Sequence, residues 1–117
     1  MCIRDSSELV RLGAGEAAIT RPDGCVAVVG RGAERRLLEV RTKPLEPVST
    51  VGSGDAFLAG YAAGLYDGRE PADCLAYGVA CGAESTQHFG AGTVDRRRVE
   101  RLLDEVEVRD LEVPAEV

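Results

Sequence analysis

The feature that most constrains the fold is a glycine-rich turn, Gly-Ser-Gly-Asp at residues 52–55, which runs directly into a long stretch of small and apolar residues. From Ala56 to Tyr66 this stretch contains no charged residue, and an Asp-Gly pair follows it. The pattern predicts a helix that starts at the turn, ends near residue 66 and is apolar on nearly all sides. Such a helix is expected to be buried, with its small residues allowing close approach of a neighbour.

Three short segments before this helix have strand character. The sequence predicts strands at residues 17–20, 25–29 and 36–41, and the Pro-Asp-Gly turn at 22–24 favours a hairpin between the first two. The near-continuous apolar run at 25–29 is typical of a strand buried on both faces. The strand at 36–41 is expected nearer an edge.

Three further helical segments are predicted. They are the last turns of a helix at residues 7–12, a second apolar helix over residues 72–87, and a third that opens at residues 94–95. The third has apolar residues at helical spacing on one face, namely Val99, Leu102, Leu103 and Val106. Glycines at residues 90–92 separate the last two helices. Short strands followed by helices indicate the α/β class.

The start of the chain does not fit this pattern. Residues 1–6, Met-Cys-Ile-Arg-Asp-Ser, resemble the translation of a transposon end, and we interpret them as a non-native scar on a truncated fragment. The alternative is a genuine short N-terminal arm. Residues 7–108 would then be the C-terminal part of a domain, and residues 109–117 an acidic tail that frays. The shortage of strands to cover the apolar helices also favours a fragment.

Composition narrows the partners. A net charge of −6 argues against nucleic acid and anionic membranes. No apolar stretch reaches the roughly 18 residues of a spanning helix, and the N-terminus lacks a secretory pattern. The four cysteines form no Cys-x-x-Cys pair, which argues against zinc. We interpret them as reduced core residues of a cytoplasmic protein.

The turn at residues 52–55 has the chemistry of an anion hole. Glycine lets the backbone approach an anion closely, and the N-terminus of the following helix supplies unpaired N–H groups and partial positive charge. Phosphate oxygens suit such a site. Asp55, in the first helical turn, is either a cap or a base that accepts the proton of an attacking hydroxyl during phosphoryl transfer. A Walker A loop would have lysine at this position, and Phe57 does not fit a dinucleotide fingerprint.

Residues 49–60, Ser-Thr-Val-Gly-Ser-Gly-Asp-Ala-Phe-Leu-Ala-Gly, resemble the second signature of the PfkB, or ribokinase-like, family of carbohydrate kinases. The resemblance extends over most of residues 7–104 and is closest to the phosphofructokinase branch, including 1-phosphofructokinase. It implies part of a three-layer α/β fold with a mostly parallel sheet. It also implies ATP-dependent phosphorylation of a sugar or sugar phosphate hydroxyl, with Mg²⁺.

The same resemblance implies roles for single residues. Asp55 would be the catalytic base, and the N–H groups of Gly52, Ser53 and Gly54 would hold the developing negative charge. The nucleotide would contact a strand–turn and a helix wall, at Thr20, Gly24, Val79 and Ala83. Many members bind a monovalent cation, which would be K⁺ here. The positions that match its ligands are Ser49, Val51, Ser85, His88 and Gly90.

The sequence also departs from the family pattern. The turn at residues 20–24 is one residue shorter than usual and lacks a middle glycine, and Ser53 replaces the commoner alanine. The family's sugar-binding motif, lid strands and Asn-x-x-Glu magnesium motif are not in this chain. We therefore expect the fragment to be inactive alone, and the resemblance allows a homodimer for the full-length form.

Several alternatives stay open at this point. The protein could be a kinase of the same fold for a nucleoside or other small alcohol, or a non-catalytic nucleotide-binding module in which Asp55 is only a cap. His88, the single histidine, is expected to be a loop residue near the nucleotide rather than an acid or base. The polar residues 84–87 either face solvent or line the nucleotide site.

Overall fold

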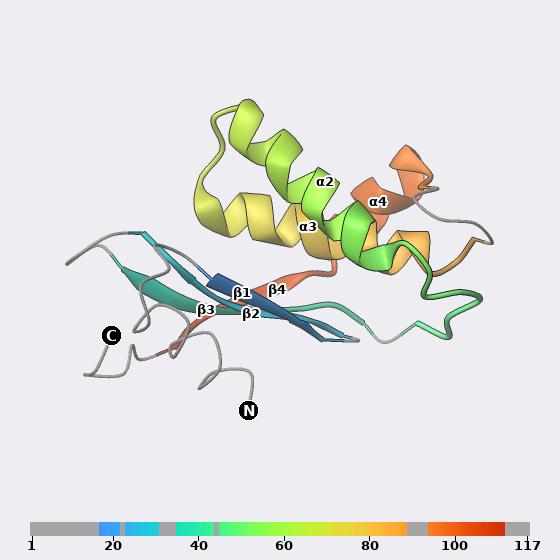
Figure 1. The fold of residues 1–117 in the computed structure, drawn as a ribbon, viewed down its shortest axis with the longest axis horizontal. Coiled ribbons are helices and arrows are strands. Elements are labelled where there is room, and N and C mark those ends of the chain that lie inside the picture. The colour runs from blue at the N-terminus through green and yellow to red at the C-terminus, as the bar shows by residue number, and fades with distance from the viewer. Residues whose placement is uncertain (1–16, 22, 31–34, 44, 89–93, 112–117) are drawn as a thin grey trace.

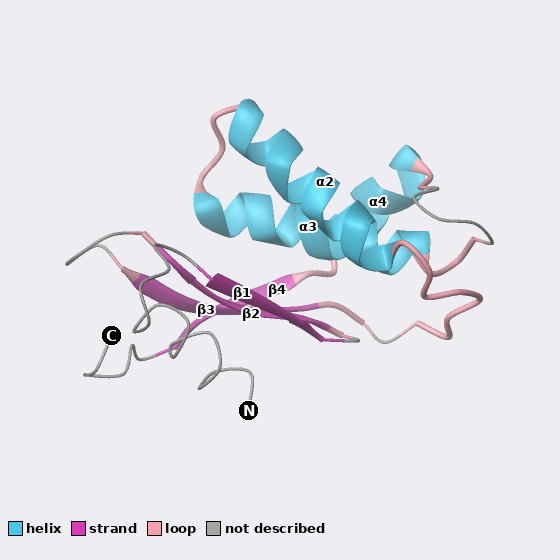
Figure 2. Cartoon of the chain, viewed as in Figure 1, coloured by secondary structure: helices cyan, strands magenta, loops and turns pink. Residues whose placement is uncertain are grey.

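The computed structural model describes residues 17–21, 23–30, 35–43, 45–88 and 94–111. These residues form a four-stranded sheet with a layer of helices on one face (Figure 1). The strands are β1 (Ala17–Arg21), β2 (Gly24–Val29), β3 (Arg36–Arg41) and β4 (Glu107–Leu111), paired in that order. The helices are α2 (Ser53–Tyr66), α3 (Pro71–Ser85) and α4 (Arg96–Leu103). Figure 2 shows the loop that connects the end of β3 to α2.

The β1–β2 hairpin forms as its turn residues predict. Arg21 pairs with Gly24, so a tight turn joins antiparallel strands. Gly24 has φ +153°, and a Cβ atom there would overlap the carbonyl oxygen of Val40 on β3. Only glycine fits this position without moving the sheet. Every residue of β2 is buried, as predicted for 25–29.

Three expectations for the sheet are corrected. All described strand pairs are antiparallel, so the mostly parallel arrangement does not hold for this part of the sheet. β3 is an interior strand rather than an edge strand, because β4 returns to pair with it. β4 includes Arg109, Asp110 and Leu111, which the sequence placed in a fraying tail. Only the pairing across the sheet orders these residues, since their own sequence is mostly charged.

Helix α3 forms the centre of the core. Its Leu75, Ala76 and Val79 pack against buried residues of β2 and β3. Its other side meets α2 at very short range, because glycines of α2 face cysteines of α3: Gly60 faces Cys81, and Gly64 faces Cys74. Both cysteines, like Cys25, are buried free thiols, as predicted.

Helix α2 is only partly buried, contrary to its predicted complete burial. Its buried residues are Ala56, Gly60 and Gly64. On the opposite side, Leu58 is 62% exposed and Tyr66 is 92% exposed. The reason is its position: α2 lies on α3, away from the sheet, so only one face has a partner among the described residues (Figure 1).

Helix α4 is shorter than its neighbours and closes one end of the core. It is capped by Asp95, whose carboxylate accepts the backbone N–H groups of Arg97 and Arg98. Val99 is buried, as the predicted apolar face requires. The expected helix at residues 7–12 and the glycine break at 90–92 lie outside the described residues. Within the described ranges, no helix is both long and apolar enough to cross a membrane.

Candidate active site

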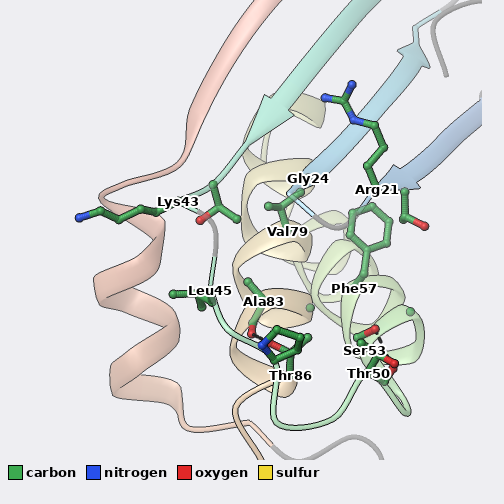
Figure 3. Close-up of a pocket in the computed structure, with 15 residues that line it drawn as sticks. Arg21, Gly24, Lys43, Leu45, Thr50, Ser53, Phe57, Val79, Ala83 and Thr86 are labelled. Atoms are coloured by element: carbon green, nitrogen blue, oxygen red, sulfur yellow. Dashed lines mark hydrogen bonds between the residues drawn. The ribbon is translucent and has the colours of Figure 1, made fainter. Parts of the chain in front are cut away.

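A cleft of about 400 Å³ opens where the ends of the strands meet the helices (Figure 3). Its walls come from the β1–β2 turn, the segment after β3, the N-terminus of α2 and one face of α3. The lining residues are Thr20, Arg21, Gly24, Thr42, Lys43, Leu45, Pro47, Thr50, Ser53, Gly54, Phe57, Val79, Gly82, Ala83 and Thr86.

One end of the cleft is the N-terminus of α2. Gly52 is the N-cap residue in the left-handed conformation, with φ 80° and ψ 2°. This backbone turn, open to glycine and strained for other residues, directs the chain into the helix. The N–H of Ser53 is used within the turn, since it donates to the carbonyl oxygen of Thr50 at 3.3 Å.

The next N–H groups of the turn are available to a ligand. Those of Gly54 and Asp55 fall in the first helical turn, where the helix supplies no acceptor, and none of the described residues accepts from them. A Cβ atom at Gly54 would meet nothing within 4 Å, so the approach to this backbone is open. The arrangement suits an anion bound at the N-terminus of a helix.

Asp55 is exposed and lies beside the cleft rather than in its wall. Its carboxylate has no hydrogen-bond or ion-pair partner among the described residues. It is the acidic residue of the first turn of α2, where the helix dipole favours a carboxylate, so both alternatives, a role at the helix start and a role as base, stay open. A free carboxylate next to unpaired N–H groups is the arrangement that a general base beside a bound phosphate requires.

All four predicted nucleotide contacts line the same cleft. Thr20 and Gly24 approach it from the β1–β2 turn, while Val79 and Ala83 face it from α3. Figure 3 shows Val79 and Ala83 between Ser53, near the helix N-terminus, and Lys43, on the other side of the view. The cleft thus joins an end that is suited to an anion to an apolar wall.

Nine of the fifteen lining residues were not selected from the sequence, and two of them, Thr42 and Lys43, are polar residues from the segment after β3. Thr42 is 8% exposed, and its hydroxyl oxygen Oγ1 is buried with no hydrogen-bond partner among the described residues. Lys43 is the single lysine of the chain, and its ammonium group lies 4.0 Å from Glu105. The available signal was a Thr-Lys pair directly after β3, at the point where the strand ends and the chain leaves the sheet.

The polar residues 84–87 were predicted either to face solvent or to line the nucleotide site. As a group they do neither. Glu84 and Ser85 are buried, at 1% and 0% exposure. The Glu84 carboxylate lies 3.3 Å from His88 Nε2 and 4.0 Å from Arg98. Thr86 lines the cleft, and Gln87 donates to the backbone of the preceding loop.

The residues predicted to hold a monovalent cation are only partly brought together. Ser49 is half-buried and its hydroxyl accepts the N–H of Val51, whose side chain is 64% exposed. Ser85 Oγ is buried and has no hydrogen-bond partner among the described residues. His88 is paired with Glu84 and does not line the cleft. Gly90 lies outside the described residues.

The sequence matches the profile of the pfkB family carbohydrate kinases over residues 6–97. The chain belongs to this family. Two curated relatives, the fructoselysine 6-kinases of Escherichia coli (strain K12) and Shigella flexneri, are each 33% identical over 84 residues. Those matches cover 71% of this chain and 31% of each relative.

Solved structures of kinases share the fold. A protein described as a phosphofructokinase from Staphylococcus aureus superposes with a TM-score of 0.82 at 24% identity, covering 96% of this chain and 35% of that one. Phosphofructokinase-2 from Escherichia coli, solved in complex with potassium, gives 0.73 at 21% identity, covering 86% and 32%. Ribokinase from Thermotoga maritima gives 0.71 at 23% identity, covering 86% and 34%. The chain thus spans about a third of the length of its relatives, and the predicted ribokinase-like α/β fold is confirmed.

Proposed function

We propose that this chain is the ATP-binding, base-carrying part of a kinase that phosphorylates a hydroxyl group of a sugar or sugar phosphate. The supporting observation is the cleft itself. It joins the open N-terminus of α2, beside Asp55, to the four residues expected to contact the nucleotide. Membership of a carbohydrate kinase family agrees with this chemistry.

In the proposed mechanism, the phosphates of ATP lie at the N-terminus of α2. The resemblance assigns the developing negative charge to the N–H groups of Gly52, Ser53 and Gly54. Since the N–H of Ser53 donates within the turn, the free N–H groups of Gly54 and Asp55 are the ones that the geometry supports for this role. The oxygen of the acceptor hydroxyl attacks the γ-phosphorus, and the Asp55 carboxylate accepts the proton that this hydroxyl loses. The bond to the leaving oxygen breaks and ADP departs. Mg²⁺, bound with ATP, would neutralise phosphate charge.

The remainder of the nucleotide would lie along the apolar wall of Val79 and Ala83. There the orphaned Thr42 hydroxyl is a suitable partner for a polar atom of the base or ribose, since a buried hydroxyl without a partner is costly. Thr20 and Gly24 would contact the phosphates and ribose from the hairpin.

The proposal also includes a monovalent cation. Potassium is named in the structure of Escherichia coli phosphofructokinase-2. In this chain the buried Ser85 hydroxyl is the observation that favours a similar ion, with Ser49, Val51, His88 and Gly90 as the other expected positions. Stimulation of turnover by KCl over choline chloride at equal ionic strength would test it, and equal rates in the two salts would argue against the ion.

The proposed acceptor is a fructose phosphate, as for a phosphofructokinase. The fold shared with the Staphylococcus aureus protein agrees with this proposal. The name of the curated relatives favours a second candidate, an amine-bearing fructose derivative such as fructoselysine. Turnover of fructose phosphates and fructoselysine by a protein that spans the full family length would decide between them. Neither a nucleic acid nor a membrane is expected as partner, and we place the protein in the cytoplasm.

The catalytic role is tested by Asp55→Ala in such a full-length protein. Loss of a general base is expected to lower kcat by about 10²- to 10⁴-fold while ATP affinity changes little. Asp67→Asn, at the other end of the same helix, is the matched control and should leave turnover unchanged. Retained turnover in Asp55→Ala would refute the role and favour the non-catalytic module.

The isolated chain is expected to bind nucleotide without transferring phosphate. Its share of the relatives' length and the exposed apolar side chains of Leu58, Leu65 and Tyr66 on α2 support this expectation. Phosphate transfer by the 117-residue chain alone would contradict it. Whether the full-length form is a homodimer is open to measurement by light scattering.

A further inference from the structure

The segment that leads into α2 is held in place by the turn at the end of α3. The carbonyl oxygen of Thr86 accepts two consecutive N–H groups, from Val48 at 2.7 Å and from Ser49 at 3.0 Å. The side-chain amide of Gln87 donates to the carbonyl oxygen of Glu46 at 3.0 Å. In the described structure, Gln87 is therefore the side chain that joins these two parts of the chain.

The orientation of the Gln87 amide is set by its neighbours. Its Nε2 also donates to Thr86 Oγ1 at 3.1 Å, and that hydroxyl in turn donates to the carbonyl oxygen of Ala83 at 2.6 Å. Since both groups facing the amide are acceptors, the NH₂ end must point toward them. A continuous series of hydrogen bonds thus runs from the last turn of α3 to Glu46.

The position of this segment is passed on to the anion-binding turn. The hydroxyl of Ser49 accepts the N–H of Val51 at 3.2 Å. The carbonyl oxygen of Thr50 accepts both the N–H and the hydroxyl of Ser53. These short-range bonds make residues 49–53 one compact unit. A shift at residues 46–49 would therefore move the start of α2 relative to the cleft.

We propose that Gln87 is a positioning residue, which holds Glu46 so that the N–H groups at the start of α2 face the cleft. Gln87 itself does not line the cleft, so it acts through the loop and not by touching a ligand. Its effect on phosphate binding rests on the function proposed above, whereas its effect on the loop does not.

The test uses three variants of the 117-residue chain and amide hydrogen exchange followed by NMR. Gln87→Met keeps the length of the side chain and removes both donors, and Gln87→Lys keeps a donor. Arg36→Met is the control, because it removes an exposed side-chain link, to Asp110, far from the cleft.

Exchange at Val48 and Ser49 is compared with exchange at Val26, in the centre of the sheet. In Gln87→Met, the exchange rate at Val48 and Ser49 should rise by about 2- to 12-fold relative to Val26, the effect of one lost hydrogen bond. Gln87→Lys should recover most of this protection, and Arg36→Met should leave the ratio unchanged. A ratio that stays the same in Gln87→Met overturns the proposal, even if the variant is less stable overall.

Binding of Mg-ATP to the same proteins, by calorimetry, tests the functional half. Gln87→Met should bind several-fold more weakly than the parent chain, and equal affinity would overturn the link from loop to ligand. A parent chain that binds no nucleotide would instead count against the proposed function, while the exchange ratio still decides whether Gln87 positions the loop.

Discussion

Gly78→Ala should destabilise the protein although alanine is the better helix former. Gly78 lies on the side of α3 that packs against α2. A Cβ atom there would be 2.9 Å from the backbone oxygen of Phe57 and 3.1 Å from two carbons of its ring. The backbone oxygen cannot rotate away, so the two helices would have to separate.

The magnitude follows from two opposing contributions. Replacing glycine by alanine inside a helix is favourable by about 1 kcal/mol. Overpacking a tight interface costs about 1–3 kcal/mol, and a clash with backbone belongs in the upper part of that range. We expect Gly78→Ala to lower the free energy of unfolding by about 1–2 kcal/mol.

Urea unfolding followed by far-UV circular dichroism measures this difference, and the chain has no tryptophan to provide a simpler signal. Gly54→Ala is the matched control for stability, because a Cβ atom there meets nothing within 4 Å. It should leave stability unchanged or raise it by up to about 1 kcal/mol. If Gly78→Ala proves as stable as the parent, the packing of α2 on α3 is looser than described and the reasoning fails.

Two further predictions concern ionisable groups. Burial raises the pKa of the Cys25 thiol to about 12 and also raises the pKa values of Cys74 and Cys81. At pH 8 all three thiols should therefore resist a thiol reagent until urea unfolds the chain. Rapid labelling of any of them in the folded protein, located by mass spectrometry, would contradict this. Hydrogen bonds from the backbone N–H groups of Arg98 and Arg97 lower the pKa of Asp95, so its stabilising effect is present above the ordinary value of about 3.9 and is lost as pH falls through the lower folded value. Asp95→Ala should therefore lower Tm at pH 7 and have a smaller effect near pH 2, and equal effects at both pH values would show that the cap is not the cause.

The local elements were largely predictable from the sequence. The Pro-Asp-Gly turn predicts the β1–β2 hairpin, and the apolar run after it becomes the buried strand β2. The glycine-rich turn before Ala56 marks the start of α2, with Gly52 in the left-handed conformation that glycine favours. In each case the preference arises within a few neighbouring residues, so it can be seen without knowing the rest of the fold.

The candidate site was predictable only where a motif or a family resemblance points to it. That resemblance selected Thr20, Gly24, Val79 and Ala83, all of which line the cleft. It did not select Thr42, whose significance comes from a buried hydroxyl that has no hydrogen-bond partner in the described part of the chain. The Thr-Lys pair after β3 marks the position of Thr42 in the sequence, but the burial of its hydroxyl depends on the segments around it.

The sequence alone determined where the glycine-rich turn lies, which helix follows it and to which family the chain is similar. The tertiary structure decided the rest: that Arg109–Leu111 pair as a strand, that α2 leaves one apolar side exposed, and that Gln87 reaches the loop before the turn. The physical reason is range. Turn and helix preferences act between neighbouring residues, whereas strand pairing, burial and the hydrogen bond from Gln87 to Glu46 depend on which distant segments meet.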